Sequence, residues 1–244
     1  MVNISATERP AIYPLCEYAL TVEFGNSIDE RVLGRVTGFN KLLLQNPFPG
    51  LYQTVPAYAS LSVFFEPLTV IRQDSMQGIG CFDKVCNYLR RLNSESEMAL
   101  ADTAANVISI PVCYGLEYGP DIAELAETRN LPVDKVINLH SAATYTVFMI
   151  GFVPGFAYLG GLDPLLESPR KATPRAIVPA GSVGIAGGQT GIYPLATPGG
   201  WQLIGRTPLK LFDATRPQPS LLKAGDKVKF EPILAADFKN YSAR

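Results

Sequence analysis

The sequence predicts a small α+β domain followed by a larger, mainly β domain. The chain has 244 residues, of which 47% are hydrophobic, enough to bury one large or two small cores. Strand and helix periodicities alternate up to about residue 92, whereas short β-rich runs with Gly and Pro turns dominate residues 145–230. A polar stretch of small residues, 93–103, separates the two patterns. We therefore expect domains at residues 1–95 and 96–244.

The first domain opens with a strand and a helix. Residues 18–24 alternate between apolar and polar side chains, as in a half-buried strand. Ser27, with Glu30 three residues later, forms a capping-box pattern that predicts a helix start. Apolar residues then recur every three or four positions and predict one buried stripe: Ile28, Val32, Val36, Phe39 and Leu43.

Two strands and a second helix complete this domain. Residues 51–58 and 61–65 have the composition of strands, and a second set of apolar residues has helical spacing: Phe82, Val85, Leu89 and Leu92. The order β-α-β-β-α predicts a small α+β sandwich.

The second domain begins with a strand at 107–114 and two short helices. Asp121 is expected to cap a helix over 121–128, and Pro132 to open another that ends near His140. The later β-rich runs predict a sandwich or a barrel. The uncharged run 141–162 is interrupted by glycines and a proline, so we expect no membrane span.

Charge and the N-terminal sequence narrow the possible functions. The formal net charge is −1 and no lysine- and arginine-rich block occurs, so nucleic acid is not an expected partner. The first ten residues lack the pattern of a secretory signal, which predicts a cytoplasmic protein. One histidine and four scattered cysteines do not form a zinc motif, and no protein-bound metal is expected.

His140, the only histidine, is a candidate proton carrier because its side chain titrates near neutral pH. The alternative is a structural role in the last turn of its helix, where a histidine interacts favourably with the helix dipole.

Several other residues could bind an anionic ligand. The run 179–191 contains five glycines, so the amides of Gly187 and Gly188 and the side chain of Gln189 could approach an anion; a glycine-rich β-hairpin is the alternative. Period-two alternation places Gln202 and Arg206 on one strand face. Three more residues could contribute charge or an apolar wall, although each also suits a purely structural role: Lys171, Arg175 and Phe156.

Long motifs in the second domain make the chain resemble the family of the 5-oxoprolinase B subunit, also named KipI or allophanate hydrolase subunit 1. They are Pro111-Val-Cys-Tyr-Gly115, Gly119-Pro-Asp121, Leu139-His140, residues 151–163, Thr173-Pro-Arg175, residues 178–194 and residues 197–208. The first domain agrees more loosely, and Cys16-Glu17 stands where family members usually carry Gly-Asp.

The resemblance implies a ferredoxin-like α+β domain followed by a cyclophilin-like β-barrel. It also implies an enzyme that converts 5-oxoproline to glutamate with ATP, brought as its Mg²⁺ complex, and two partners, the A and C subunits of the same enzyme. On this basis His140 is expected to handle a proton, Gln202 and Arg206 to orient substrate or phosphate oxygens, and Gly187, Gly188 and Gln189 to line the same pocket.

Two other functions stay open for a chain with this resemblance. Members of the KipI type are inhibitors of a sensor histidine kinase, and paired domains of this kind also form the carboxyltransferase half of urea carboxylase. The chain has no biotin-accepting Met-Lys-Met motif, which argues against the second function.

Overall fold

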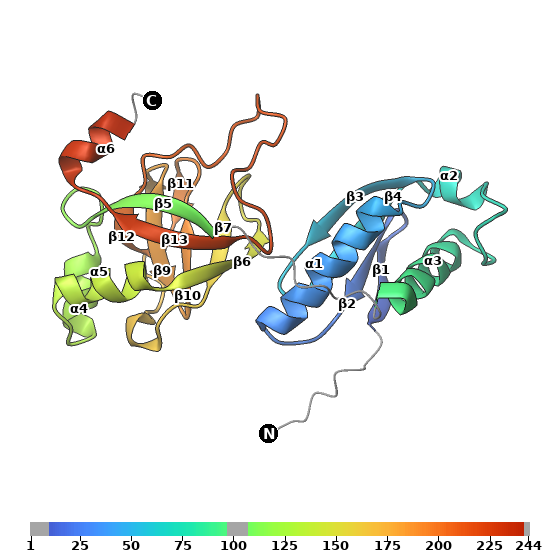
Figure 1. The fold of residues 1–244 in the computed structure, drawn as a ribbon, viewed down its shortest axis with the longest axis horizontal. Helices are drawn as coiled ribbons and strands as arrows, with labels where there is room; N and C mark the ends of the chain where they lie inside the picture. The colour runs from blue at the N-terminus through green and yellow to red at the C-terminus, as the bar shows by residue number, and fades with distance from the viewer. Residues whose placement is uncertain (1–9, 97–106, 242–244) are drawn as a thin grey trace, which may run out of the picture. The chain divides into compact units, whose positions relative to one another are not determined.

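The computed structural model describes residues 10–96 and 107–241, and the chain divides into two compact units, Met1–Ala104 and Ala105–Arg244. The predicted boundary near residue 96 falls at the end of a helix, because Asn93 to Ser96 form its last turn. The rest of the predicted linker, 97–103, lies outside the described residues. Each unit is described separately (Figure 1).

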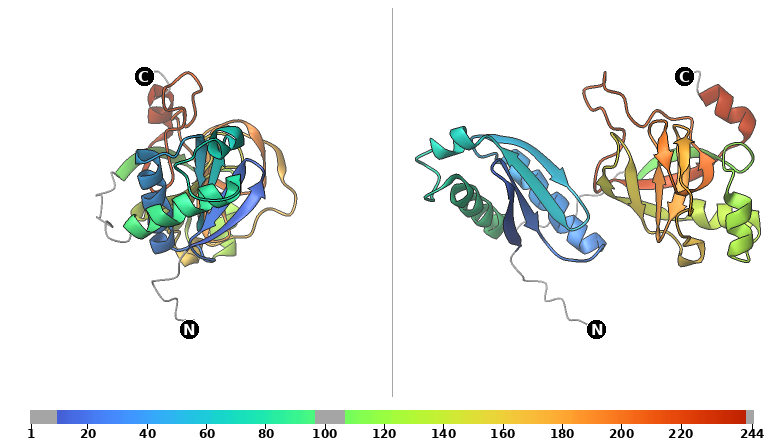
Figure 2. Two further views of the ribbon diagram at one scale, coloured as in Figure 1. Left: turned by 90° about the vertical axis from the view of Figure 1, so that its right-hand side faces the viewer. Right: turned by 180° about the vertical axis from the view of Figure 1, so that it is seen from behind.

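The first unit is an antiparallel sheet covered by helices on one face (Figures 1 and 2). Its sheet order is β1-β2-β4-β3. The predicted β-α-β-β-α order is present as β2, α1, β3, β4 and α3, with a strand and a short helix in addition. The elements are β1 (Ala11–Cys16), β2 (Ala19–Glu23), α1 (Glu30–Gln45), β3 (Leu51–Pro56), β4 (Ser60–Phe65), α2 (Pro67–Ile71) and α3 (Cys81–Ser96).

Helix α1 starts later than its predicted capping box. Asp29 is the N-cap, and its carboxylate accepts a hydrogen bond from the Arg31 amide at 2.7 Å. Ile28 therefore precedes the helix and is exposed, whereas Leu33 takes a place in the buried stripe. The stripe packs with α3 on Leu20, Val22, Leu61 and Val63 of the sheet, which places the core of this unit between the helices and the sheet.

The second unit is a barrel with short helices. Its elements are β5 (Val107–Tyr114), α4 (Ile122–Thr128), α5 (Val133–Ala142), β6 (Thr144–Ile150), β7 (Ala157–Gly160), η1 (Pro164–Leu166), β8 (Arg175–Val178), β9 (Ser182–Ala186), β10 (Gln189–Ile192), β11 (Thr197–Gly199), β12 (Gln202–Arg206), β13 (Lys227–Pro232) and α6 (Ala235–Tyr241). The predicted predominance of short strands after residue 144 is confirmed.

Seven strands close the barrel in the order β10-β7-β6-β13-β5-β12-β9. Only the β13–β5 pair is parallel among them. Apolar side chains from alternate strand positions fill the interior, among them Val112, Val147, Leu159, Ile185 and Phe230. Strands β8 and β11 form a separate two-stranded sheet, and α4 and α5 lie side by side at one end of the barrel (Figure 1).

The structure bears out the α+β and barrel character of the two units. The ferredoxin-like class of the first unit and the cyclophilin-like class of the barrel stay predictions. No helix within residues 10–96 and 107–241 is long and apolar enough to cross a membrane.

Candidate functional site

Asp121 is held against strand β12 by two reciprocal hydrogen bonds. Its amide donates to the Leu203 carbonyl at 2.9 Å, and its Oδ2 accepts from the Leu203 amide at 2.7 Å. The preceding loop can come this close because residue 119 is glycine: a Cβ there would lie 2.0 Å from the Ile204 carbonyl oxygen. Asp121 occupies the N-cap position of α4, but its side chain does not cap the helix, contrary to the prediction.

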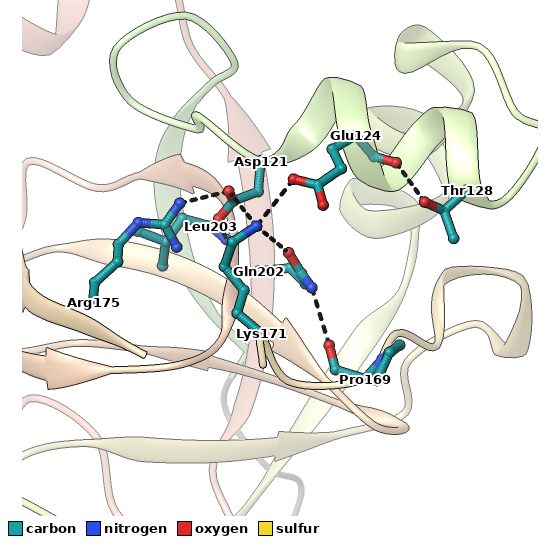
Figure 3. Close-up of polar contacts among 8 residues, drawn as sticks. All are labelled: Asp121, Glu124, Thr128, Pro169, Lys171, Arg175, Gln202 and Leu203. Atoms are coloured by element: carbon teal, nitrogen blue, oxygen red, sulfur yellow. Dashed lines mark hydrogen bonds and ion pairs between the residues drawn. The ribbon is translucent and has the colours of Figure 1, made fainter. Parts of the chain in front are cut away.

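Two cations contact the Asp121 carboxylate: Lys171 from the segment before β8, and Arg175 from the first position of β8 (Figure 3). Nη2 of Arg175 lies 2.5 Å from Oδ1, and Nζ of Lys171 lies 3.1 Å from the same oxygen. Lys171 also contacts Glu124 Oε2 on α4 at 3.0 Å. Asp121, Glu124, Lys171 and Arg175 together form the Asp121 cluster, which joins α4, β8, β12 and the 169–175 segment.

Burial and hydrogen bonding act in opposite directions on Asp121. Its side chain is 4% exposed, and burial raises its pKa. Hydrogen bonds from Arg175, the Leu203 amide and Lys171 outweigh burial, so the pKa ends below its usual value. The hydrogen bond to Glu124 is the main reason that the pKa of Lys171 is raised. Asp121 and Lys171 are therefore both charged at neutral pH.

Gln202 is the predicted β12 residue that joins this cluster. Its Oε1 accepts from Lys171 Nζ at 3.2 Å, and its Nε2 donates to the Pro169 carbonyl at 3.1 Å (Figure 3). Gln202 therefore fixes the orientation of the lysine that contacts Asp121.

Arg206 does not join Gln202, contrary to the prediction from strand alternation. A register shift between Leu203 and Gly205 breaks the period of two in β12. Arg206 Nε donates to the Ala180 carbonyl at 2.7 Å, and its guanidinium lies over the Phe238 ring. The contacts described for Arg206 share no residue with those of Gln202.

His140 lies in the last turn of α5, and its side chain is fully buried. Its ring stacks on Phe230 with centroids 4.6 Å apart. Nδ1 lies 2.8 Å from the Tyr114 hydroxyl, and Nε2 lies 2.9 Å from Thr190 Oγ1. Both ring nitrogens are therefore occupied by side chains of the barrel.

The hydrogen bonds define the protonation state of His140. Thr190 donates its single hydroxyl hydrogen to the Gly184 carbonyl at 3.0 Å, so it accepts from Nε2–H. Nδ1 then carries no hydrogen and accepts from the Tyr114 hydroxyl. Burial lowers the pKa of His140 to about 3, which agrees with a neutral ring. This geometry favours the structural alternative, while the proton role stays a prediction.

The predicted anion-binding glycines form the turn of the hairpin between β9 and β10. Ala186 pairs with Gln189, which leaves Gly187 and Gly188 as the two turn residues. The Gly187 amide donates to the Ser168 carbonyl at 2.7 Å, so it is not free for a ligand. Gln189 begins β10 next to Thr190. The hairpin alternative describes this segment.

Phe156 belongs to an aromatic cluster on the barrel rather than to an open pocket wall. It is buried and its ring lies 5.1 Å from that of Tyr193 and 5.5 Å from that of Trp201. Two glycines of the glycine-rich run make room for these rings: a Cβ on Gly184 or Gly191 would lie about 3 Å from Trp201. Core packing is therefore the role that the contacts of Phe156 show.

Asp121 and Glu124 take part in the cluster but are absent from the predicted site residues. The motif Gly119-Pro-Asp121 was a usable signal, since a glycine two residues before an acidic residue can mark a close backbone approach. The described parts of the chain contain no group of three or more His, Cys, Asp or Glu side chains arranged to hold a metal ion.

The sequence of the chain is similar to those of known proteins. The sequence matches the family described as carboxyltransferase domain, subdomain C and D, over residues 10–222. It is 43% identical to the 5-oxoprolinase B subunit of Bacillus subtilis, covering 96% of this chain and 98% of the relative. Identity to the 5-oxoprolinase B subunit of Escherichia coli O157:H7 is 39%, covering 92% and 97%.

A solved structure extends the comparison to the fold. The crystal structure of TTHA0988 superimposes with a TM-score of 0.73 at 35% identity and covers 88% of this chain. This chain spans only 40% of that longer chain.

Proposed function

The chain belongs to the family of carboxyltransferase domains, subdomains C and D, and to its 5-oxoprolinase B-subunit members, and on this premise we propose that it acts as the B subunit of an ATP-dependent 5-oxoprolinase. The reaction opens 5-oxo-L-proline to L-glutamate and requires the A and C subunits. The observation that carries the proposal is 43% identity to a B subunit along nearly the whole of both chains.

ATP is needed because a lactam is a stabilised amide. In the proposed sequence, the lactam carbonyl oxygen attacks the γ-phosphorus and ADP leaves, which forms an imidate-like phosphate. Water then adds to the activated carbon, the ring C–N bond breaks, and phosphate leaves. The products are glutamate, ADP and phosphate, so ATP hydrolysis drives the ring opening.

The Asp121 cluster supports binding of the anionic substrate. Lys171 and Arg175 supply positive charge, and guanidinium and ammonium groups pair well with carboxylates. Gln202 orients Lys171. These groups bind and orient the substrate, and both carboxylates of the cluster are already paired with cations, which supports shared catalysis with the partner proteins.

The glycine-rich hairpin does not fit a phosphate cradle. The Gly187 amide already donates to Ser168, and the Gly181 amide donates to the Tyr193 carbonyl. A phosphate loop needs such amides free and aimed at one anion. We therefore propose that a partner protein provides most of the contacts to ATP and its Mg²⁺.

The finer fold classes and the location belong to the same proposal. The sheet order β1-β2-β4-β3 with helices on one face supports a ferredoxin-like first unit in which the edge strand β1 comes from the start of the chain. The closed seven-stranded barrel supports a cyclophilin-like second unit. We also propose a cytoplasmic location, because the proposed reaction consumes ATP.

The test is ATP hydrolysis that depends on 5-oxoproline, measured together with glutamate release. The chain is assayed alone and then mixed with homologues of the A and C subunits. We expect coupled ADP and glutamate formation in the mixture and none with the chain alone.

No coupled activity in a mixture of folded proteins would contradict the proposal. In that case, specific capture by the dimerisation domain of a sensor histidine kinase would favour the KipI-type inhibitor. Biotin-dependent carboxyl transfer in the mixture would favour the carboxyltransferase half.

A further inference from the structure

The charges of the Asp121 cluster balance. Lys171 and Arg175 carry two positive charges, and Asp121 and Glu124 carry two negative charges. Only Glu124 is largely exposed, at 69% of its side chain, so solvent screens its charge most strongly. The field at the cations is therefore weakly positive. Such a field suits a ligand with one negative charge better than a polyphosphate with three or four.

Arg175 has an unused hydrogen-bond donor in this cluster. Its Nη2 donates to Asp121, whereas its Nη1 is buried and has no hydrogen-bond partner among residues 10–96 and 107–241. A buried donor without an acceptor costs roughly 1–3 kcal/mol, so an acceptor from outside the chain would be favoured at this position. Because Nη1 is enclosed, the acceptor must be small, such as one oxygen of a carboxylate.

Asp121 is built to hold both cations in place. Its carboxylate is fixed on β12 by the Leu203 amide, and its backbone is fixed by the Leu203 carbonyl. Oδ1 contacts both Arg175 and Lys171, so one oxygen sets the separation of the two cationic groups. The side chains of Arg175 and Lys171 are 27% and 21% exposed, so part of each faces solvent while Nη1 of Arg175 lies beneath the surface.

We propose that this cluster receives the carboxylate of the lactam substrate, with Asp121 as the positioning residue that also sets the preference for a monoanion over a polyphosphate. Arg175 Nη1 is the group that donates to the carboxylate, and Lys171, whose three ammonium donors already face Asp121, Glu124 and Gln202, adds positive charge beside it. The identity of the substrate rests on the proposed function, whereas the charge preference rests on the cluster alone.

Calorimetric titration of the full chain tests this assignment with three probes. They are 5-oxoproline, its uncharged carboxamide and ATP. We expect 5-oxoproline to bind, and the carboxamide and ATP to bind at least about tenfold more weakly. Equal binding of the carboxamide, tighter binding of ATP, or no binding of 5-oxoproline would overturn the proposal.

Two variants separate the roles within the cluster. Arg175→Lys keeps the charge but removes the planar pair of donors, so we expect about a tenfold loss of 5-oxoproline affinity. Asp121→Asn retains an acceptor for the Leu203 amide but removes one negative charge. We expect it to shift the ratio of ATP to 5-oxoproline affinity at least about tenfold towards ATP, which a merely structural role would not do.

Asp213→Asn is the matched control. Asp213 also pairs with one lysine and one arginine, Lys210 and Arg216, elsewhere in the barrel unit. This variant makes the same change in net charge and should leave the affinity ratio unchanged. Fluorescence of Trp201, the only tryptophan, checks that each variant is folded.

The experiments distinguish a wrong assignment of the Asp121 cluster from a wrong proposed function. If the mixture releases glutamate but Arg175→Lys and Asp121→Asn leave the 5-oxoproline KM and the affinity ratio unchanged, the cluster assignment is wrong and the function stands. If the mixture is inactive while the chain still prefers a monoanion in the wild type and loses that preference in Asp121→Asn, the function is wrong and the cluster stands.

Discussion

Two polar clusters in the barrel unit, one fully buried around His140 and one at the surface around Asp121, use their hydrogen-bonding groups differently. Around His140, both ring nitrogens have barrel partners, and the ring is neutral. Around Asp121, charged groups meet near the surface, and Arg175 retains an unpartnered donor. A closed network stabilises one arrangement of the strands, whereas an incomplete one leaves a place for a ligand. Burial of a titratable side chain alone therefore does not identify a binding site.

The largest expected effect comes from removing His140. His140→Ala leaves a cavity and deprives Tyr114 and Thr190 of their partner, so the free energy of unfolding should fall by about 3 to 5 kcal/mol. Urea unfolding followed by Trp201 fluorescence measures it in the barrel unit. In the assembled enzyme, at a temperature where the variant is folded, kcat should stay within about threefold. A loss of 100-fold or more, typical of a missing general acid or base, would restore the proton role.

The approach of the Asp121 loop to β12 should be the next most sensitive feature. Gly119→Ala would place a Cβ 2.0 Å from the Ile204 carbonyl oxygen, so the loop must move. We expect a loss of about 2 kcal/mol or more and weaker 5-oxoproline binding. Gly34→Ala is a control with the opposite expected sign. Gly34 lies in α1 with no described atom within 4 Å of its Cβ position, so this substitution should stabilise the protein by roughly 0.5–1 kcal/mol. Thermal unfolding of both variants gives the comparison. An unchanged melting temperature for Gly119→Ala would contradict the described loop contact.

The free energy of unfolding should depend on pH because His140 is neutral in the folded protein. The pKa of His140 is 6.5 when unfolded and about 3 when folded, so between these values the unfolded state binds one more proton. The free energy of unfolding should therefore fall as pH decreases, by up to about 1.4 kcal/mol per pH unit, with no such contribution above pH 6.5. Burial raises the pKa of the neighbouring Tyr114 and Tyr145, which stay neutral in this range.

Between pH 6.5 and about 5 most carboxylates do not yet titrate, so this window isolates the histidine. His140→Gln keeps one donor and one acceptor and should remove the slope there, whatever its overall stability. Equal slopes for the two proteins would show that His140 does not stay neutral in the fold.

The smallest effect is expected for Arg206, which lies outside both clusters. Arg206→Ala removes the bond to Ala180 and the contact with the Phe238 ring, so the loss of stability should be about 1 kcal/mol or less. The affinity for 5-oxoproline should be unchanged in the same titration that tests Arg175→Lys. Loss of binding would instead support the paired role of Gln202 and Arg206 predicted from strand alternation.

The sequence predicts elements better than it predicts sites. The buried apolar stripe of α1 and the succession of short strands after residue 144 follow from local periodicity, which is visible in the sequence. The role of Asp121 depends on Leu203, 82 residues away, and no local pattern reports that contact. The register shift in β12 defeats period-two alternation, so Gln202 was placed correctly on the strand but given the wrong companion.

His140 illustrates the same limit. Its position in the last turn of α5 follows from the helix pattern. Its surroundings depend on Tyr114 and Thr190, which the barrel brings from other strands. A single histidine in a sequence therefore suggests chemistry until the fold shows whether both of its nitrogens are already used.

The parallel pairing of β13 with β5 has a consequence for how the protein is made. β13 joins residues 227–232 to residues 107–112, and it also pairs with β6. During synthesis, strands β5 to β12 leave the ribosome before the strand that closes the barrel, and Phe230, which stacks on His140, arrives with it. The sheet of the first unit is complete by residue 65. The first unit can thus fold while translation continues, whereas the barrel keeps open strand edges, exposed to aggregation, until residues 227–232 of β13 have been added.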